Sequence, residues 1–124
     1  MIIDAHAHFG NGDGKNITFD KIQLHMKNNG IAKVVLFAIT SDHMIKDSLN
    51  ILELSKKDKR VIPFLRFNPN LLKKKELESL LSQGFKGVKL HPRSQNFNPL
   101  HKKFTWIYKT IEKFKIPIIF HCKS

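Results

Sequence analysis

Short apolar runs alternate along the chain with longer stretches in which apolar residues recur every three or four positions. The short runs are typical of buried strands, because several are rich in Val and Ile and are bounded by polar or turn-forming residues. They predict five strands, at residues 2–6, 33–39, 61–66, 87–91 and 117–121.

The longer stretches have helical spacing. Thr18 is placed to cap a helix over residues 19–29, and Gly30 follows as a stop signal. Three more helices are predicted at residues 42–57, 71–83 and 100–115. Each of the four has an apolar stripe, which we expect to face the core.

This strict alternation of strand and helix predicts an α/β fold with a parallel sheet and crossover helices. Right-handed crossovers place all helices on one side if consecutive strands are neighbours. A TIM-type (β/α) barrel, of which 124 residues with five parallel strands would form about half, is one architecture that covers the other face, and the pattern alone does not separate it from an open sheet. A doubly wound open parallel sheet is the alternative. With no linker-like segment, we expect residues 1–124 to form a single domain.

The charge is strongly basic, with 22 Lys and Arg against 10 Asp and Glu and a net charge of +12. Such a charge attracts nucleic acid or anionic substrates. The lysines, however, form short clusters at residues 56–57, 73–75 and 102–103, where exposed helix faces account for them. Nucleic-acid binding is therefore not favoured, and a basic binding or interaction module is kept as an alternative to an enzyme.

Location is indicated by three features. No stretch reaches the apolar length of a membrane span, and the N-terminus has no signal-peptide pattern. The single cysteine, Cys122, cannot form a disulfide within the chain. We expect a cytoplasmic protein that does not contact a membrane.

Candidate chemistry begins in the N-terminal segment MIIDAHAHFG. Positions two apart in a strand share a face, so His6 and His8 present two imidazoles in one direction, as metal ligands do. By the same alternation Asp4 lies on that face, one step deeper. An isolated pair of this kind is more often two ordinary residues at a strand end.

Four further polar residues lie at the carboxyl ends of predicted strands: Arg66, Lys89, His91 and His121. Parallel α/β folds place their active sites at this edge of the sheet. Together with the N-terminal pair, these side chains predict one site.

Four motifs resemble a known family in their order and spacing: IDAHAHFG at 3–10, LRFNPN at 65–70, GFKGVKLHP at 84–92 and IPIIFHC at 116–122. They resemble the N-terminal half of the amidohydrolase superfamily, in particular the amidohydrolase-related branch that includes aminocarboxymuconate-semialdehyde decarboxylase. The resemblance implies half of a TIM-type barrel and a metal-dependent hydrolase or decarboxylase acting on a small organic, carboxylate-bearing substrate.

The resemblance also implies a metal site. Its ligands would be His6, His8 and His121, holding a divalent metal that is most often Zn²⁺, with Mn²⁺ as the alternative. Asp4 would orient a ligand imidazole, or be bonded elsewhere in the barrel.

The remaining site residues have more than one reading. Lys89 would be a cationic substrate contact, an ion-pair partner or a carboxylated metal bridge, and Arg66 would bind a substrate carboxylate or form a structural ion pair. His91 would be an acid/base group or a loop residue.

A deoxyribonuclease-like enzyme of the same superfamily is a further alternative, but that branch usually has a glutamate on its fourth strand, where this chain has Lys89 and His91. We expect the glycines of residues 9–16 to mark a mobile loop over the site, with a phosphate cradle as a weaker alternative.

The chain departs from the family pattern towards its end. The sixth-strand histidine and eighth-strand aspartate of the family have no counterpart, and residues 122–124 replace the usual small residue and glycine. We expect weak or no activity from this chain alone. Because a half-barrel exposes its inner face and two strand edges, we also expect either a homo-oligomer or a separate C-terminal half as partner.

Overall fold

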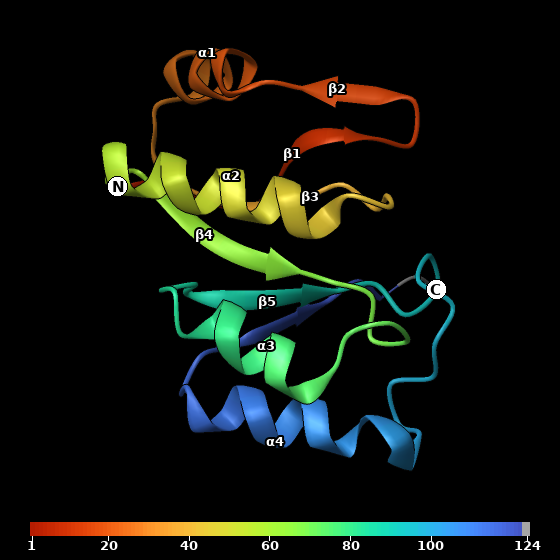
Figure 1. Ribbon diagram of the computed structural model, residues 1–124. Helices are drawn as coiled ribbons and strands as arrows, with labels where there is room; N and C mark the ends of the chain where they lie inside the picture. Colours follow the sequence, from red (N-terminus) through yellow and green to blue (C-terminus); the bar gives the residue numbers. More distant parts are fainter. Residues whose placement is uncertain (123–124) are drawn as a thin grey trace.

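The computed structural model describes residues 1–122 (Figure 1). The elements are β1 Ile2–Gly12, β2 Lys15–Ile17, α1 Phe19–Asn29, β3 Ile31–Ala38, α2 Met44–Lys57, β4 Val61–Arg66, α3 Lys74–Leu81, β5 Gly87–Leu90, the 3₁₀ helix η1 Lys102–Phe104, α4 Thr105–Lys113 and β6 Ile118–Phe120.

The strands form one sheet in the order β2-β1-β3-β4-β5-β6. The pairs β1–β3, β3–β4, β4–β5 and β5–β6 are parallel, and only β2 runs antiparallel, beside the end of β1. The predicted α/β half-barrel is confirmed. The doubly wound alternative is wrong, because the strand order never reverses and the helices lie on one side of the curled sheet (Figure 1).

Two helices, α3 and α4, begin three or more residues later than predicted, because asparagines close turns in front of them. Asn68 accepts hydrogen bonds from the backbone of Asn70 and Leu71, so α3 starts at Lys74 instead of residue 71. The Asn98 side chain accepts the Leu100 N–H in the same way, and α4 starts at Thr105. Asn favours such turns over a helix interior.

The outer face of the sheet, under the helices, holds most of the core. Leu65, Val88 and Leu90 are fully buried beneath α3 and α4, in a cluster that includes Leu77 and Ile111. A second cluster joins Val34 and Leu36 of β3 to Ile22 and Met26 of α1 and Ile51 of α2. The predicted apolar stripes therefore face the core, and burial of these side chains stabilises the fold.

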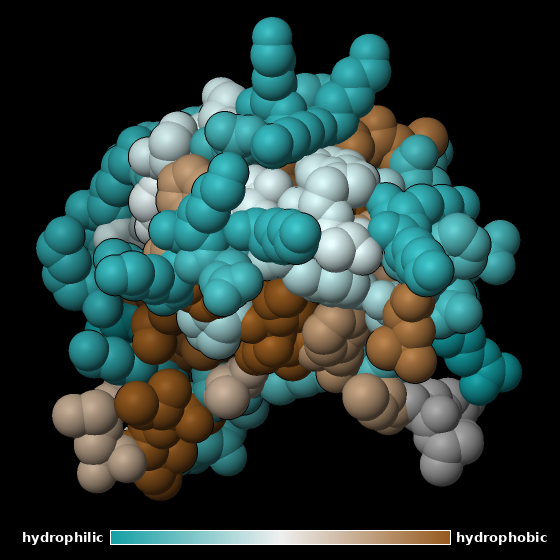
Figure 2. Space-filling model, turned by 90° about the horizontal axis from the view of Figure 1, so that it is seen from below, coloured by the Kyte–Doolittle hydropathy of each residue, from teal (hydrophilic) through white to brown (hydrophobic). Residues whose placement is uncertain are grey.

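The inner, concave face has a smaller apolar layer. It consists of Val35, Phe37 and Phe64, with the partly buried Ile62 and Ile119 packed beside them. In the view from below, apolar side chains gather along the hollowed side of the molecule (Figure 2). This face is covered by no helix of residues 1–122.

Outside these layers the surface is basic. The three lysine clusters predicted to be solvated, at residues 56–57, 73–75 and 102–103, are all exposed. Within residues 1–122, none of the helices combines the length and the apolar character needed to cross a membrane.

Candidate active site

The first strand brings its two histidines to the inner face. The rings of His6 and His8 each pack edge-on against Phe37 of the inner layer, with centroid distances of 4.9 and 4.8 Å. Their own centroids are 5.2 Å apart. Ala7, between them, packs on the helix-side cluster. The expected alternation therefore holds over this part of β1.

It fails at Asp4, because β1 carries a β-bulge. Asp4 pairs with Val34 and Ala7 with Leu36, so three steps along β1 oppose two steps along β3. The extra residue reverses the alternation and turns Asp4 to the outer side, with Val34. There Asp4 Oδ2 lies 3.0 Å from His25 Nε2 of α1, and Oδ1 accepts the His6 backbone N–H at 3.0 Å. The expectation that Asp4 orients a ligand imidazole is corrected: its carboxylate is bonded elsewhere.

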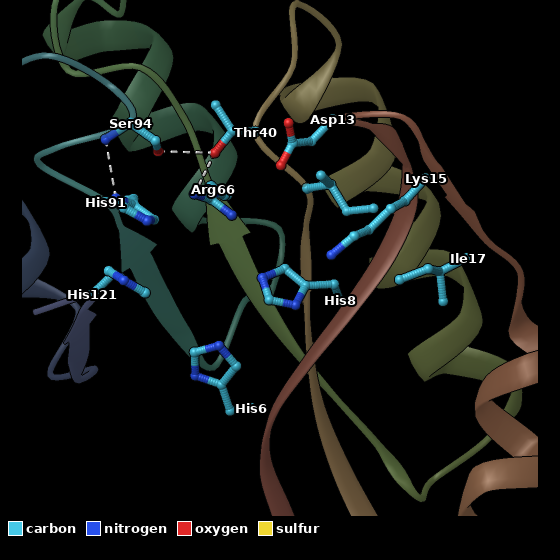
Figure 3. A pocket seen from close by; sticks show the side chains of 11 residues that line it. His6, His8, Asp13, Lys15, Ile17, Thr40, Arg66, His91, Ser94 and His121 are labelled. Atoms are coloured by element: carbon cyan, nitrogen blue, oxygen red, sulfur yellow. Dashed lines mark hydrogen bonds between the residues drawn. The ribbon is translucent and has the colours of Figure 1, made fainter. Parts of the chain in front are cut away.

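Side chains from β1, β2 and the ends of β3, β4, β5 and β6 surround a pocket of about 380 Å³ at the carboxyl edge of the sheet (Figure 3). It is lined by His6, His8, Asp13, Lys15, Ile17, Ile39, Thr40, Arg66, His91, Ser94 and His121. Five of the seven side chains predicted for the site, namely His6, His8, Arg66, His91 and His121, are in this group. Lys89 lies beneath them, and Asp4 is on the other side of the sheet.

Two buried cations lie at the bottom of the site: Arg66 lines the pocket, and Lys89 lies beneath it. Arg66 and Lys89 are neighbours in the β4–β5 register and are each only 1% exposed. Burial lowers the pKa of Arg66 to about 10, and burial together with the Arg66 charge lowers the pKa of Lys89 to about 8. None of the ion pairs formed within residues 1–122 includes either side chain.

Arg66 is held rigidly. Its Nη1 donates to the Ala38 carbonyl at 2.9 Å and its Nη2 to Thr40 Oγ1 at 2.5 Å. In the described part of the chain Arg66 Nε and Lys89 Nζ have no hydrogen-bond partner, and Lys89 Nζ lies 4.8 Å from the centre of the Phe37 ring. Unmet donors on buried cations are costly, which is typical of a site that receives an anion.

The hydrogen bonds around His91 define its tautomer. Nδ1 accepts the backbone N–H of Ser94 at 3.1 Å, so the proton of the neutral ring is on Nε2. The backbone N–H of His91 is bound by the buried side chain of Gln95, which in turn donates to the Phe67 carbonyl. The neutral His91 ring therefore offers a donor, not an acceptor, to the pocket.

Three of the imidazoles are kept neutral by their surroundings. Burial, with the neighbouring His6, lowers the pKa of His8 to about 4, and burial, with the Lys89 charge, lowers the pKa of His6. Burial, then His121, also lowers the pKa of His91. At neutral pH these rings have the free nitrogen lone pairs that Zn²⁺ requires.

The neutral imidazole nitrogens thus fit a divalent metal. The three predicted ligands, however, do not all lie together. His6 and His8 form one pair, and His121 is stacked on His91 with a centroid distance of 3.8 Å. Within residues 1–122, no three or more His, Cys, Asp or Glu side chains are close enough together to hold a metal ion.

Glycine-rich residues 9–16 form a β-hairpin, not the expected mobile loop. β1 continues to Gly12 and pairs with β2 in the register Gly10↔Ile17 and Gly12↔Lys15. The hairpin brings Asp13 and Lys15 to the pocket, and sequence reasoning did not place either of them there. The dipeptide Asp13-Gly14 was the available signal, since Asp-Gly favours two-residue hairpin turns.

Comparisons with known proteins agree with this geometry. The family model described as Amidohydrolase matches residues 3–123, and no curated protein matches the chain. Similar solved structures include a protein assigned as a 2-pyrone-4,6-dicarboxylic acid hydrolase from Acinetobacter baumannii, with citric acid bound. It is 18% identical, with a TM-score of 0.71 over 98% of this chain and 49% of that one. A Staphylococcus aureus protein assigned as an amidohydrolase is 17% identical, with a TM-score of 0.73 over 98% of this chain and 47% of that one.

At these identities the structures show the fold alone, and this chain spans about half their length. Because the family model covers nearly the whole chain, the chain belongs to the amidohydrolase family.

Proposed function

We propose that this chain supplies the metal-binding and substrate-binding half of a metal-dependent hydrolase that acts on a small organic substrate bearing a carboxylate. Family membership supports a hydrolase-type function. The observation that carries the proposal is the pocket itself: histidines predicted as ligands and the buried Arg66 line it at the carboxyl edge of one parallel sheet, with Lys89 beneath, and neither cation has an acidic partner within residues 1–122.

The metal would be held by His6, His8 and His121, with Zn²⁺ favoured over Mn²⁺ because all three donors are imidazole nitrogens. When bound, such a metal activates water or a carbonyl group as a Lewis acid. Asp4 has no part in this proposal.

The cations would bind and orient the substrate. Arg66, fixed by Ala38 and Thr40, and Lys89 beside it would attract a carboxylate to the floor of the pocket. His91, with its proton on Nε2, would donate a hydrogen bond to the substrate and could pass that proton to a leaving group. We favour hydrolysis over decarboxylation as the family chemistry here.

We also propose a cytoplasmic location. Cys122 is a free, exposed thiol, which persists more readily in a reducing compartment than in an oxidising one.

The first test is metal content per chain, measured by elemental mass spectrometry after purification and after incubation with Zn²⁺ or Mn²⁺. We compare the native chain with a His6→Ala, His8→Ala double variant and with His101→Ala, a matched control whose exposed side chain lies outside the pocket.

The proposal predicts near-stoichiometric metal in the native chain and the control, and its loss in the double variant. No metal in the native chain after incubation would contradict the proposal, as would metal that the double variant retains. In the first case the basic binding module would become the leading hypothesis.

A further inference from the structure

The β1–β2 hairpin carries a third cation to the pocket. On β2, Lys15 and Ile17 share a face and both line the pocket, while Asn16 between them lines a separate groove beside α2. The Lys15 side chain extends towards the ring of His8, from the side opposite His91 and His121 (Figure 3). Its charge is close enough to contribute to the lowered pKa of His8.

Close packing holds the hairpin in this position. A Cβ at Gly12 would lie 2.8 Å from the Thr40 carbonyl oxygen and 2.9 Å from a side-chain carbon of Ile39, so only glycine lets the strand approach β3 this closely. Arg66 is bonded to the same Thr40 through its hydroxyl. The hairpin and the floor of the pocket are thus fixed to one short segment.

Hydrogen bonds anchor both strands of the hairpin. His43 Nε2, just before α2, donates to the Asn11 carbonyl at 3.1 Å, and Lys21 Nζ of α1 donates to the Asn16 carbonyl at 2.7 Å. The turn itself is tight, since Asp13 and Gly14 have φ angles of 51° and 72°, as a type I′ hairpin requires. The backbone that carries Lys15 is therefore set before any ligand arrives, which limits the entropy lost on binding.

Lys15 has no acidic partner in the described residues. The ion pairs of residues 1–122 involve His25, His43, Lys56 and Arg60, and Asp13 on the same hairpin does not pair with Lys15. The pocket therefore has Arg66 at its floor, with Lys89 buried beneath it, and Lys15 at its rim.

We propose that Lys15 is a specificity-determining residue that binds a second anionic group of the substrate while the first carboxylate binds at the floor. The substrate class is then a small acid with two separated anionic groups. This inference rests on the proposed function, because it takes the floor as the site of the first carboxylate.

The test is binding of benzoate, with one carboxylate, and isophthalate, with two, to the metal-free chain by titration calorimetry at fixed ionic strength. The variants are Lys15→Met, Lys15→Arg and Gly12→Ala. Lys27→Met, in the last turn of α1, is the matched control because it removes an exposed lysine that does not line the pocket.

We expect Lys15→Met to raise the Kd of isophthalate about tenfold, the value of one charge-assisted hydrogen bond, and to leave the Kd of benzoate unchanged. Lys15→Arg should restore most of the isophthalate affinity, and Gly12→Ala, which displaces the hairpin and meets Thr40 beside Arg66, should weaken binding of both acids. Lys27→Met should bind both acids as the native chain does.

Two results overturn the inference alone: Lys15→Met binds isophthalate like the native chain, or it loses affinity for both acids by the same factor. A native chain that binds neither acid contradicts the floor assignment as well, and so the carboxylate part of the proposed function. The metal measurement remains independent of all these outcomes.

Discussion

The two faces of the sheet are built on opposite principles, and adjacent residues of β5 show the contrast. Leu90 points outward into the largest apolar cluster, and Lys89 points inward, almost equally buried but with no hydrogen-bond partner for its ammonium group within residues 1–122. The outer face gains free energy from burial, whereas the inner face holds charge at a cost. Adjacent residues of one strand therefore serve different purposes: Leu90 stabilises the fold, and Lys89 places a charge beneath the candidate site.

The largest expected effect comes from the outer face. Leu90→Ala should lower the free energy of unfolding by about 2–5 kcal/mol, because it leaves a cavity between β5 and the helices. Urea denaturation measures the change. Leu71→Ala is the control, since that side chain is 77% exposed, and it should stay within about 0.5 kcal/mol of the native chain. An equal loss in both variants would contradict the assignment of the core.

A substitution at the neighbouring Lys89 should raise the free energy of unfolding. Lys89→Met keeps the volume and removes a buried, unpaired charge, so we expect a gain of about 1 kcal/mol or more at pH 7. The pKa of Lys89 is about 8 in the folded chain against 10.5 in the unfolded one, so the unfolded chain binds more protons between these values. Native stability then rises with pH across that window, and the advantage of the variant shrinks.

Urea denaturation of the native chain and Lys89→Met at pH 7 and pH 10 checks both parts. Lys86→Met is the control, because Lys86 is exposed. A variant less stable than the native chain at pH 7 would mean that Lys89 makes a favourable contact, and the contrast between the faces would fail at this position.

The same contrast explains which site residues could be predicted from sequence. Four of them lie on or directly after short strands with a continuous register: Arg66, Lys89, His91 and His121. In such strands the two-residue alternation of side chains predicts the face on which each one lies. Asp4 was placed wrongly because the bulge in β1 depends on pairing with β3, which the residues of β1 do not reveal.

The hairpin and the hydrogen bonds beneath the pocket were missed for different reasons. Asp13-Gly14 carried a local signal, but the surrounding glycines were interpreted as mobility, whereas Gly12 is needed for close approach to β3. The contacts of Arg66 with Ala38 and Thr40 join residues 28 and 26 positions apart, respectively. Such contacts follow from the tertiary fold and have no pattern along the chain.

A third prediction concerns the edge of the sheet at β6. Phe120 is 36% exposed there, and we expect two copies of the chain to associate through this edge and the bare inner face. Light scattering after size exclusion at micromolar concentration should give a mass above 14.4 kDa for the native chain and a mass near 14.4 kDa for Phe120→Glu. Leu71→Glu, at an exposed site away from this edge, should behave as the native chain does. A monomeric native chain would refute the association.

The smallest effect tests the imidazoles of the inner face. Because the pKa of His8 is about 4 in the folded chain and near 6.5 when unfolded, the unfolded chain binds more protons between these values. Stability of the metal-free chain should therefore fall as the pH drops from about 6.5 to 4, and fall less steeply in His8→Gln. Thermal unfolding across this range measures the slopes, with the exposed His101→Gln as control.

Added Zn²⁺ sharpens the same test, because protons and metal compete for one nitrogen lone pair. The rise in Tm caused by Zn²⁺ should be larger at pH 7 than at pH 4, where His8 is about half protonated, and should be lost in His8→Gln. If His8→Gln and the native chain have parallel pH profiles, burial does not control this imidazole, and the inner face differs less from the outer than Lys89 and Leu90 suggest. If only the zinc effect is missing, the histidines are held neutral for a purpose other than metal binding.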